Sequence, residues 1–299
     1  MPTIEENASY WKDPRSWARS GDNWSETWGG SSAQWWWTIL PRIHMFVPTG
    51  TILEIAPGFG RWTNFLKDLC KKLTVVDLVE ECIETCKRRF AASDNISYYV
   101  NDGKSLPMVR DGSVDFVFSF DSLVHADEDV VRAYLSELRF KMKRNGAAFI
   151  HHSNLGRYDD KLSLTVRRAA RRVLNSKVSW LSVLERPGIV EPLGMRAKGM
   201  TSEKFASFAE EAGLSCISQE EINWNGGWLI DCISIVTPKG SAWEQPRRVI
   251  ENKRWLNEAE NARVLSGLYA DQGGDAKAIR QPTKKAELTE LGIEPLSDR

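Results

Sequence analysis

The chain lacks the features that would tie it to nucleic acid, to a membrane or to secretion. It carries no excess charge, because 40 basic residues balance 40 acidic ones, and this argues against a bulk nucleic-acid binder. It has no apolar run of membrane-spanning length. Its start, MPTIEENASYWKD, has neither the basic end nor the apolar stretch of a signal peptide. We therefore expect a cytoplasmic protein with no membrane partner.

Cysteine is sparse as well. The five cysteines are an odd number, and their spacings match no zinc or redox motif. Cys82 and Cys86 stand four residues apart, so they share one face of a predicted helix. We expect buried, reduced thiols in a protein whose apolar and charged fractions, 42% and 27%, are those of an ordinary globular chain.

Between about 51 and 151, short apolar runs alternate with helical stripes. The five runs are TILEIA (51–56), LTVVD (73–77), ISYYV (96–100), VDFVFSF (114–120) and AAFIH (147–151). Strands that alternate with helices predict a parallel sheet with helices on both faces. Two more strand-like runs, 214–222 and 228–236, are joined by Asn225-Gly226-Gly227, which predicts a hairpin and an antiparallel final strand. Residues 247–270 are predicted to be helical.

The loop after the first strand has the residues of a ligand site. In the run Glu54-Ile55-Ala56-Pro57-Gly58-Phe59-Gly60, a tight glycine turn lets the backbone approach a ligand at the carboxyl end of the sheet. Asp77 ends the second strand, where a carboxylate can accept hydrogen bonds from both hydroxyls of a ribose. Gly-x-Gly alone is a weak signal, because any loop that needs a positive φ would show it.

Further residues narrow the kind of ligand. Asp102-Gly103 follows the third strand, where an adenine amino group would need an acceptor, and Glu54 is placed to meet the cationic end of an amino acid. A dinucleotide site would instead need a third glycine near Thr63, and a phosphate gains nothing from a nearby Glu54. The sequence therefore predicts an adenosine without phosphates that carries a charged tail.

The chain resembles the class I S-adenosylmethionine-dependent methyltransferases over about 50–237. The matching pieces are LEIAPGFG (53–60), VVDL (75–78), NDGKSLP (101–107), VDFVFSFDSLVHA (114–126) and the hairpin into 228–236. The resemblance implies S-adenosyl-L-methionine as the cofactor. It also implies a Rossmann-like α/β fold, doubly wound, with a mostly parallel seven-stranded sheet whose last strand is antiparallel.

The same resemblance implies which residues bind the cofactor. They are Glu54, Ala56, Gly58 and Gly60 for the methionine part, Asp77 and Leu78 for the ribose, Asp102 and Gly103 for the adenine, and Phe120 at the end of the fourth strand. Ala56 stands where the usual family motif has its first glycine, and Pro57 follows it. This departure alters the loop slightly but leaves the glycines of closest approach in place.

The methyl acceptor is expected beyond the ends of the fourth and fifth strands, where His125, His151 and His152 lie. A hydroxyl acceptor loses its proton as its oxygen is methylated, and histidine suits that role at neutral pH. We name His125 and His152 as candidate bases, with Asp121 orienting the base or the acceptor hydroxyl. The plainer alternatives are histidines that order a loop and an ordinary loop carboxylate. These residue types can also bind a metal, but nothing in their spacing demands one, so we predict none.

Two segments are predicted to surround this core. Seven of the 13 tryptophans fall in the first 37 residues, and in this family such a segment often covers the cofactor cleft, so 1–50 is predicted to be a helical cap. A packed helix that buries its aromatics is the alternative. Three adjacent tryptophans, 35–37, cannot all face one side of it. Within the methyltransferase domain, 51–240, a helical insert is expected at about 155–200. Residues 241–299 are predicted to be a helical extension and a polar tail.

The basic residues of the insert bear on the choice of acceptor. They are Arg157, Lys161, Arg167, Arg168, Arg171 and Arg172. They would recognise an anionic acceptor or form a solvated helix face. The sequence as a whole favours O-methylation of a small polar or glycan acceptor. The alternatives are an N-methyltransferase that acts on an amine or a protein, and a non-catalytic module that only binds the cofactor.

Overall fold

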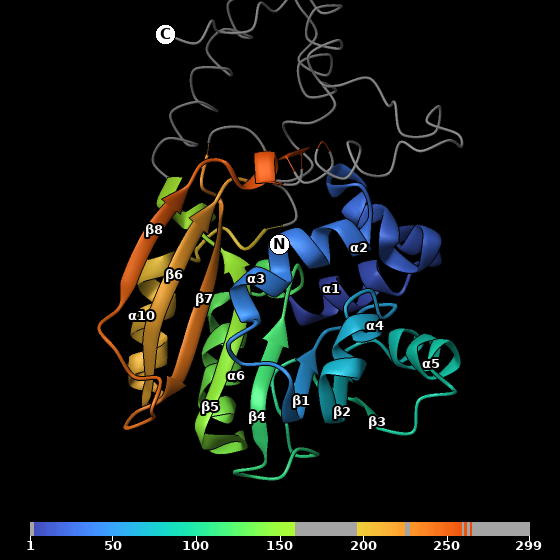
Figure 1. Cartoon of the computed structure of the whole chain (residues 1–299), viewed down its shortest axis with the longest axis horizontal. Helices are drawn as coiled ribbons and strands as arrows, with labels where there is room; N and C mark the ends of the chain where they lie inside the picture. Colours follow the sequence, from blue (N-terminus) through green and yellow to red (C-terminus); the bar gives the residue numbers. More distant parts are fainter. Residues whose placement is uncertain (1–2, 159–195, 225–227, 259, 262–263, 265–299) are drawn as a thin grey trace, which may run out of the picture.

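A mixed sheet of eight strands runs through the computed structural model, in the order β3-β2-β1-β4-β5-β7-β6-β8 (Figure 1). The structure describes the chain except residues 1–2, 159–195, 225–227, 259, 262–263 and 265–299. The strands are β1 (Thr49–Ile55), β2 (Cys70–Asp77), β3 (Ile96–Val100), β4 (Val114–Ser119), β5 (Met142–Ser153), β6 (Leu214–Ile222), β7 (Asp231–Pro238) and β8 (Arg248–Asn252).

The directions of the strands confirm the predicted fold class. Strands β1 to β5 pair in parallel, and β7 runs antiparallel to both β5 and β6. The predicted antiparallel pairing is therefore confirmed for β6 and β7, while the Asn-Gly-Gly turn itself, 225–227, lies outside the described residues. The strand count is one higher than predicted, because β8 joins the edge of the sheet in parallel with β6.

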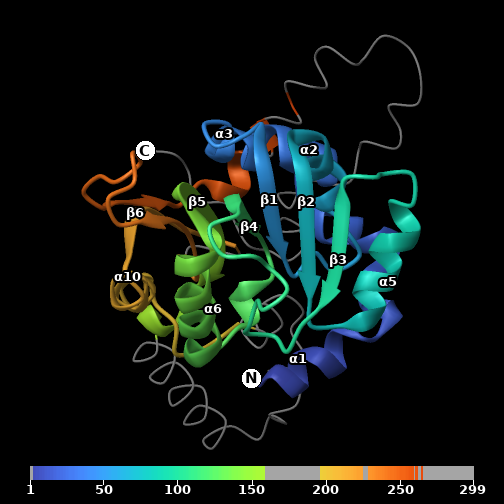
Figure 2. The same ribbon diagram turned by 90° about the horizontal axis from the view of Figure 1, so that it is seen from below.

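Helices cover both faces of this sheet. The α-helices are α1 (Ile4–Trp11), α2 (Ser31–Gln34), α3 (Leu40–Ile43), α4 (Thr63–Leu66), α5 (Glu80–Arg89), α6 (Glu128–Lys141) and α10 (Ser202–Glu211). Tighter or wider helical turns are η1 (Pro14–Trp28), η2 (Trp35–Ile39), η3 (Lys67–Leu69), η4 (Leu123–His125) and η5 (Leu155–Tyr158). Figure 2 shows α6 and α10 on one side of the sheet and α2 and α3 on the other.

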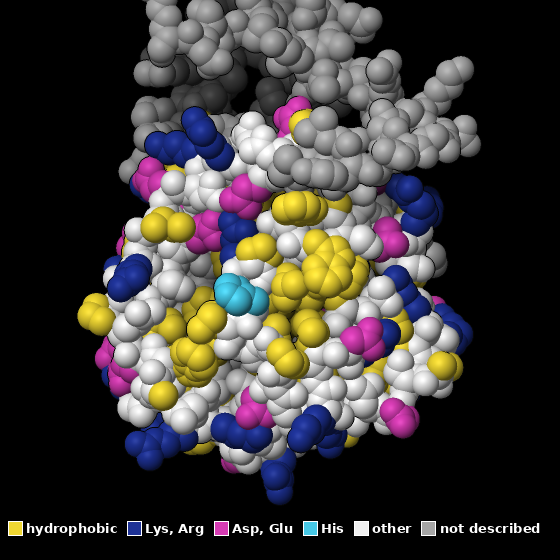
Figure 3. Space-filling view, viewed as in Figure 1, with side chains coloured by type: hydrophobic (Ala, Val, Ile, Leu, Met, Phe, Trp, Pro, Cys, Tyr) yellow, Lys and Arg dark blue, Asp and Glu magenta, His cyan; other side chains and the backbone are white. Residues whose placement is uncertain are grey.

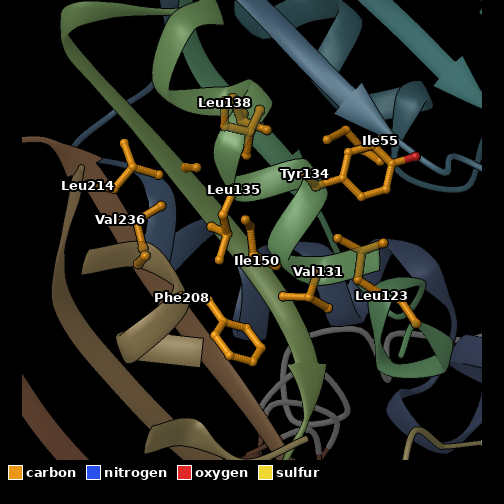
Figure 4. Close-up of a cluster of buried hydrophobic side chains, with 14 of the residues drawn as sticks. Ile55, Leu123, Val131, Tyr134, Leu135, Leu138, Ile150, Phe208, Leu214 and Val236 are labelled. Carbon is orange, nitrogen blue, oxygen red and sulfur yellow. The ribbon is translucent and has the colours of Figure 1, made fainter. Parts of the chain in front are cut away.

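Side chains alternate along the strands, so each face of the sheet has its own core. In β1, Leu53 and Ile55 join the core under α6 and α10, while Ile52 faces the other core with Phe116 and Phe118 of β4. Figure 4 shows the first core, with the apolar stripe of α6 lying against strand side chains and Phe208 of α10. The second core takes aromatic side chains from the N-terminal segment, so part of that segment is integral to the domain.

Several boundaries differ from those predicted. Cys70 begins a strand although its spacing fits a helix, and the strand predicted at 147–151 extends over β5. The expected helix at 247–270 begins instead with strand β8, whose residues are almost all exposed. An edge strand is held by its backbone hydrogen bonds to one neighbour, so it needs no apolar alternation that could reveal it in the sequence. Most of the basic insert, 159–195, lies outside the described residues.

Candidate active site

A cavity of about 780 Å³ opens at the carboxyl ends of the central strands. Such a cavity at the switch point of a doubly wound sheet is the expected place for a ligand. The loop after β1 forms part of its wall, and the backbone there has positive φ at Ala56 (57°), Gly58 (57°) and Gly60 (83°). The left-handed conformation explains the glycines, and it makes Ala56 an exception that the loop tolerates.

Asp77 and its neighbour form the next part of the wall. The Asp77 carboxylate accepts hydrogen bonds from the backbone N–H groups of Gly58 (3.1 Å) and Val79 (2.8 Å), so it ties the glycine loop to the end of β2. Burial raises the pKa of Asp77 to about 6. Leu78 and Gly103 line the same end of the cavity, as the sequence predicts. Each carboxylate oxygen has a second lone pair available to a ligand hydroxyl.

Three residues predicted for the cofactor do not line the cavity. Glu54 is buried behind the loop, where Thr63 Oγ1 donates a hydrogen bond to its Oε2 (2.6 Å) and burial raises its pKa to about 8. Gly60 packs against Phe90. Asp102 is exposed, and its carboxylate accepts the N–H groups that follow it in its own turn. Glu54 and Gly60 therefore support the loop from its buried side, and Asp102 stabilises its own turn. None of the three needs a direct contact with a ligand.

The cavity is also lined by Phe120, a residue predicted to bind the cofactor, and by the predicted acceptor residues Asp121 and His125, and we call this part of it the acceptor end. His125 lies in η4 with its ring 5.2 Å from that of Trp11, measured between centroids, and Asn7 donates to its carbonyl oxygen (3.0 Å). Asp121 has a φ of 62°, and its carboxylate pairs with Arg61 (2.8 Å). The structure therefore brings His125 and Asp121 into one cavity with the glycine loop.

His152 lies elsewhere, and its assignment as a base is corrected. Its side chain is completely buried, stacks on Phe205 at 4.1 Å, and has its Nε2 2.8 Å from Ser234 Oγ. Burial lowers its pKa to about 3, so it stays neutral and satisfied. The alternation of β5 explains this result, because His151 and His152 must face opposite sides of the sheet.

The acceptor end also contains charged residues that sequence analysis missed. Arg61 and Arg196 both line the cavity, and Arg196 forms a buried bidentate ion pair with Asp231 (2.6 and 2.7 Å). Trp224 completes this wall, with the Arg196 guanidinium 5.4 Å from its ring centroid. Arg61 follows the glycine loop directly, so its place in the sequence is a signal that it lies near the cavity. Arg196 and Asp231 are separated by 35 residues, and no spacing rule connects them.

The N-terminal tryptophan-rich segment contributes four of the six indoles that line the cavity. The six are Trp11, Trp17, Trp24, Trp28, Trp62 and Trp224. Trp17 stacks on Phe59 at 4.9 Å and lies so close to Gly58 that a Cβ there would collide with it. The three adjacent tryptophans diverge, because Trp35 is buried while Trp36 and Trp37 are 60% and 46% exposed. Figure 3 shows hydrophobic side chains gathered on the surface of the molecule over α2 and α3.

Among the residues that the structure describes, no group of three or more histidine, cysteine, aspartate or glutamate side chains could hold a metal ion. No helix in this described part of the chain is long and apolar enough to cross a membrane.

Comparison with known proteins gives one family match. Residues 52–146 match the model of a methyltransferase domain, and no curated protein matches the chain. A solved protein from Pyrococcus horikoshii OT3 is 19% identical, with 68% of this chain and 88% of that chain covered and a TM-score of 0.48. A SAM dependent methyltransferase from Aquifex aeolicus is 14% identical over 75% and 97% of the two chains, with a TM-score of 0.47. The DhpI-SAM-HEP complex is 17% identical over 79% and 97%, with a TM-score of 0.49.

Proposed function

We propose that this chain, which belongs to the class I S-adenosylmethionine-dependent methyltransferases, methylates a hydroxyl oxygen of a small ring-shaped acceptor. The observation that carries the proposal is that two sets of residues line one cavity. One set is the glycine loop with Asp77, and the other is His125 and Asp121 among indole rings. A volume of about 780 Å³ lies in the upper part of the range for ligand sites, which leaves room for a cofactor and an acceptor together.

The cofactor end fits an adenosine that carries an amino-acid tail. Asp77 has lone pairs available for ribose hydroxyls, and Leu78 with Gly103 forms an apolar wall suited to adenine. Gly58 and Ala56 of the glycine loop also line this part of the cavity. When bound, S-adenosylmethionine supplies an activated methyl group. Glu54 supports the loop from behind, so its part in cofactor binding is indirect.

The acceptor end favours a neutral ring. Its flat walls are aromatic and include Trp24, Trp28 and Phe120, on which the C–H face of a sugar or the face of an aromatic ring can stack. The positive charge of the two arginines there is already balanced by Asp121 and Asp231. We therefore propose a hydroxylated, uncharged acceptor and place less weight on an anionic one.

His125 and Asp121 have separate roles in this proposal. The Asp121 carboxylate accepts a hydrogen bond from the acceptor and orients it, while His125 takes the hydroxyl proton as the oxygen is methylated. Arg61 keeps the carboxylate of Asp121 in place through its 2.8 Å ion pair. An amine acceptor is the second candidate, because the same carboxylate would also hold an ammonium group.

Product analysis tests this function. The protein is incubated with methyl-labelled S-adenosylmethionine and a small-molecule cell extract, with the His125→Asn variant in parallel. We expect label in a methyl ether of a small molecule and a much lower yield with the variant. Label on nitrogen or on protein would replace O-methylation by the amine alternative. Cofactor binding without any transfer would identify a non-catalytic module.

A further inference from the structure

A buried chain of polar contacts runs behind the acceptor end of the cavity. The backbone N–H of Asp121 donates a hydrogen bond to His151 Nδ1 (3.1 Å), and His151 Nε2 lies 3.4 Å from Asp231 Oδ2. Asp231 in turn accepts two hydrogen bonds from Arg196. His151 and Asp231 are completely buried, whereas Asp121 and Arg196 line the cavity. Residues from the ends of three strands thus meet behind the wall of the acceptor end, together with Arg196, which follows the insert in the sequence.

Among these four residues, Asp121 has an unusual backbone conformation. Its φ of 62° lies in the left-handed region, which is uncommon for residues other than glycine, although aspartate adopts it more readily than most. Three contacts hold it there. The backbone N–H of Asp121 donates a hydrogen bond to His151, and the carboxylate of Asp121 accepts one from Arg61. The hydroxyl of the next residue, Ser122, donates to the carbonyl oxygen of Ala56 (2.8 Å). Such strain is typical of a side chain that must be presented in one direction.

The hydrogen bond to Asp121 also fixes the proton on His151. A ring nitrogen that accepts from a backbone N–H carries no proton, so the proton of the neutral ring is on Nε2, toward Asp231. Burial would raise the pKa of Asp231, but the facing Arg196 guanidinium outweighs it and holds that pKa well below its usual range. Asp231 is therefore an anion that attracts the Nε2 proton. The rings of Phe120 and Trp224, at 4.6 and 5.3 Å between centroids, hold the imidazole from the sides.

We propose that His151 is a positioning residue for methyl transfer: as the neutral Nε2–H tautomer set by Asp231 and Arg196, it holds Asp121 so that its carboxylate faces the acceptor. The inference rests on the proposed function, because it assumes that Asp121 contacts the acceptor. Asp231 then acts indirectly. It contacts neither the Asp121 carboxylate nor the cavity, but it orients the imidazole ring of His151, which in turn positions Asp121.

Two substitutions separate this role from simple packing. In His151→Asn the amide can offer an oxygen near the position of Nδ1, so it can still accept from the N–H of Asp121. In His151→Gln the longer side chain places its amide near Nε2 and loses that bond. We expect His151→Asn to keep methyl transfer within about threefold of the wild type. We expect His151→Gln to lose about 100-fold, the size of effect that a misplaced reacting group produces. The readout is label transferred from S-adenosylmethionine to the extract, with the exposed His44→Asn as control.

The control measurements keep the outcomes distinct. Affinity for S-adenosylhomocysteine should stay within about twofold in both His151 variants, because the glycine loop and Asp77 are untouched. Equal losses in the Asn and Gln variants would show a packing role and overturn the inference. If the wild type transfers no label, the proposed function fails, and a second experiment still decides the part of the inference that concerns the hydrogen bond and tautomer of His151.

That second experiment needs no acceptor, and it uses the variant only to assign the signals of the wild type. The imidazole ¹⁵N spectrum of the wild-type chain, which has four histidines, is assigned for His151 by the signals missing from His151→Asn. We expect His151 as the neutral form with its proton on Nε2 at pH 7. A proton on Nδ1, or a ring protonated at both nitrogens, is incompatible with acceptance of the N–H of Asp121 and would overturn the proposal.

Discussion

Glu54 gives the sharpest stability prediction, because a carboxyl group is buried there without full hydrogen bonding. Its Oε2 accepts from Thr63 Oγ1 (2.6 Å), and its Oε1 has no partner among the described residues. Burial raises its pKa from an ordinary 4.5 to about 8. Glu54→Gln keeps the shape of the side chain and cannot ionise, so it isolates the free-energy cost of the buried charge.

The direction of the effect follows from proton linkage. Between pH 4.5 and 8 the folded protein keeps a proton on Glu54 that the unfolded chain has released, so the free energy of unfolding falls as pH rises. The full loss is at most about 5 kcal/mol, or about 1.4 kcal/mol per pH unit. Asp77, whose pKa is raised by burial from 3.8 to about 6, contributes its own loss below pH 6. The range from pH 6 to 8 therefore reports on Glu54.

Urea unfolding at pH 6, 7 and 8 measures this directly. Between pH 6 and 8 we expect the free energy of unfolding of the wild type to fall by about 2 kcal/mol more than that of Glu54→Gln, because only the wild type has the buried carboxyl that releases its proton on unfolding. The exposed Glu80→Gln is the matched control and should follow the wild type. If the stabilities of Glu54→Gln and the wild type fell in parallel over this range, the reasoning about the buried carboxyl would be refuted.

Three further predictions concern the cavity. Asp77→Ala should weaken binding of S-adenosylhomocysteine by about 1.5–3 kcal/mol in calorimetry, the range for hydrogen bonds to a charged group, and an unchanged affinity would remove Asp77 from the site. His125→Ala should lower kcat by about 10²–10⁴-fold, and near-full activity of His125→Asn would reduce the residue to a loop-ordering role. Deletion of residues 1–12 should weaken cofactor binding while hardly changing the unfolding midpoint, since α1 has no buried residue but lines the cavity. A drop in stability like that of Trp35→Ala, about 3–5 kcal/mol, would contradict this view of α1.

The sequence predicted the sheet and the cofactor end because both depend on short-range patterns. Alternating strands and helices, the glycine turn and the acidic end of β2 are contiguous signals, and Gly58 and Asp77 line the cavity. Strand β8 was missed because an exposed edge strand has no apolar alternation. The sequence also could not tell that Asp102 uses its carboxylate to close its own turn.

The acceptor end could be predicted only in part, because its residues meet through tertiary packing. His125 follows β4, so its position at the end of that strand could be predicted. Which of His151 and His152 faces the cavity depends on how the side chains of β5 alternate between the two faces of the sheet. Arg196 precedes helix α10 and strand β6, whereas Asp231 is the first residue of β7. Nothing local in the sequence marks either residue as a partner of the other.

Cofactor binding is the measurement that tests the central claim most directly. Calorimetric titration of the purified protein with S-adenosylhomocysteine and with NAD compares an adenosine without phosphates with a dinucleotide at the same site. The account predicts saturable binding of S-adenosylhomocysteine, together with a higher melting temperature through preferential binding to the folded state, and no comparable effect of NAD. Equal binding and stabilisation by NAD, or no binding of S-adenosylhomocysteine, would contradict it.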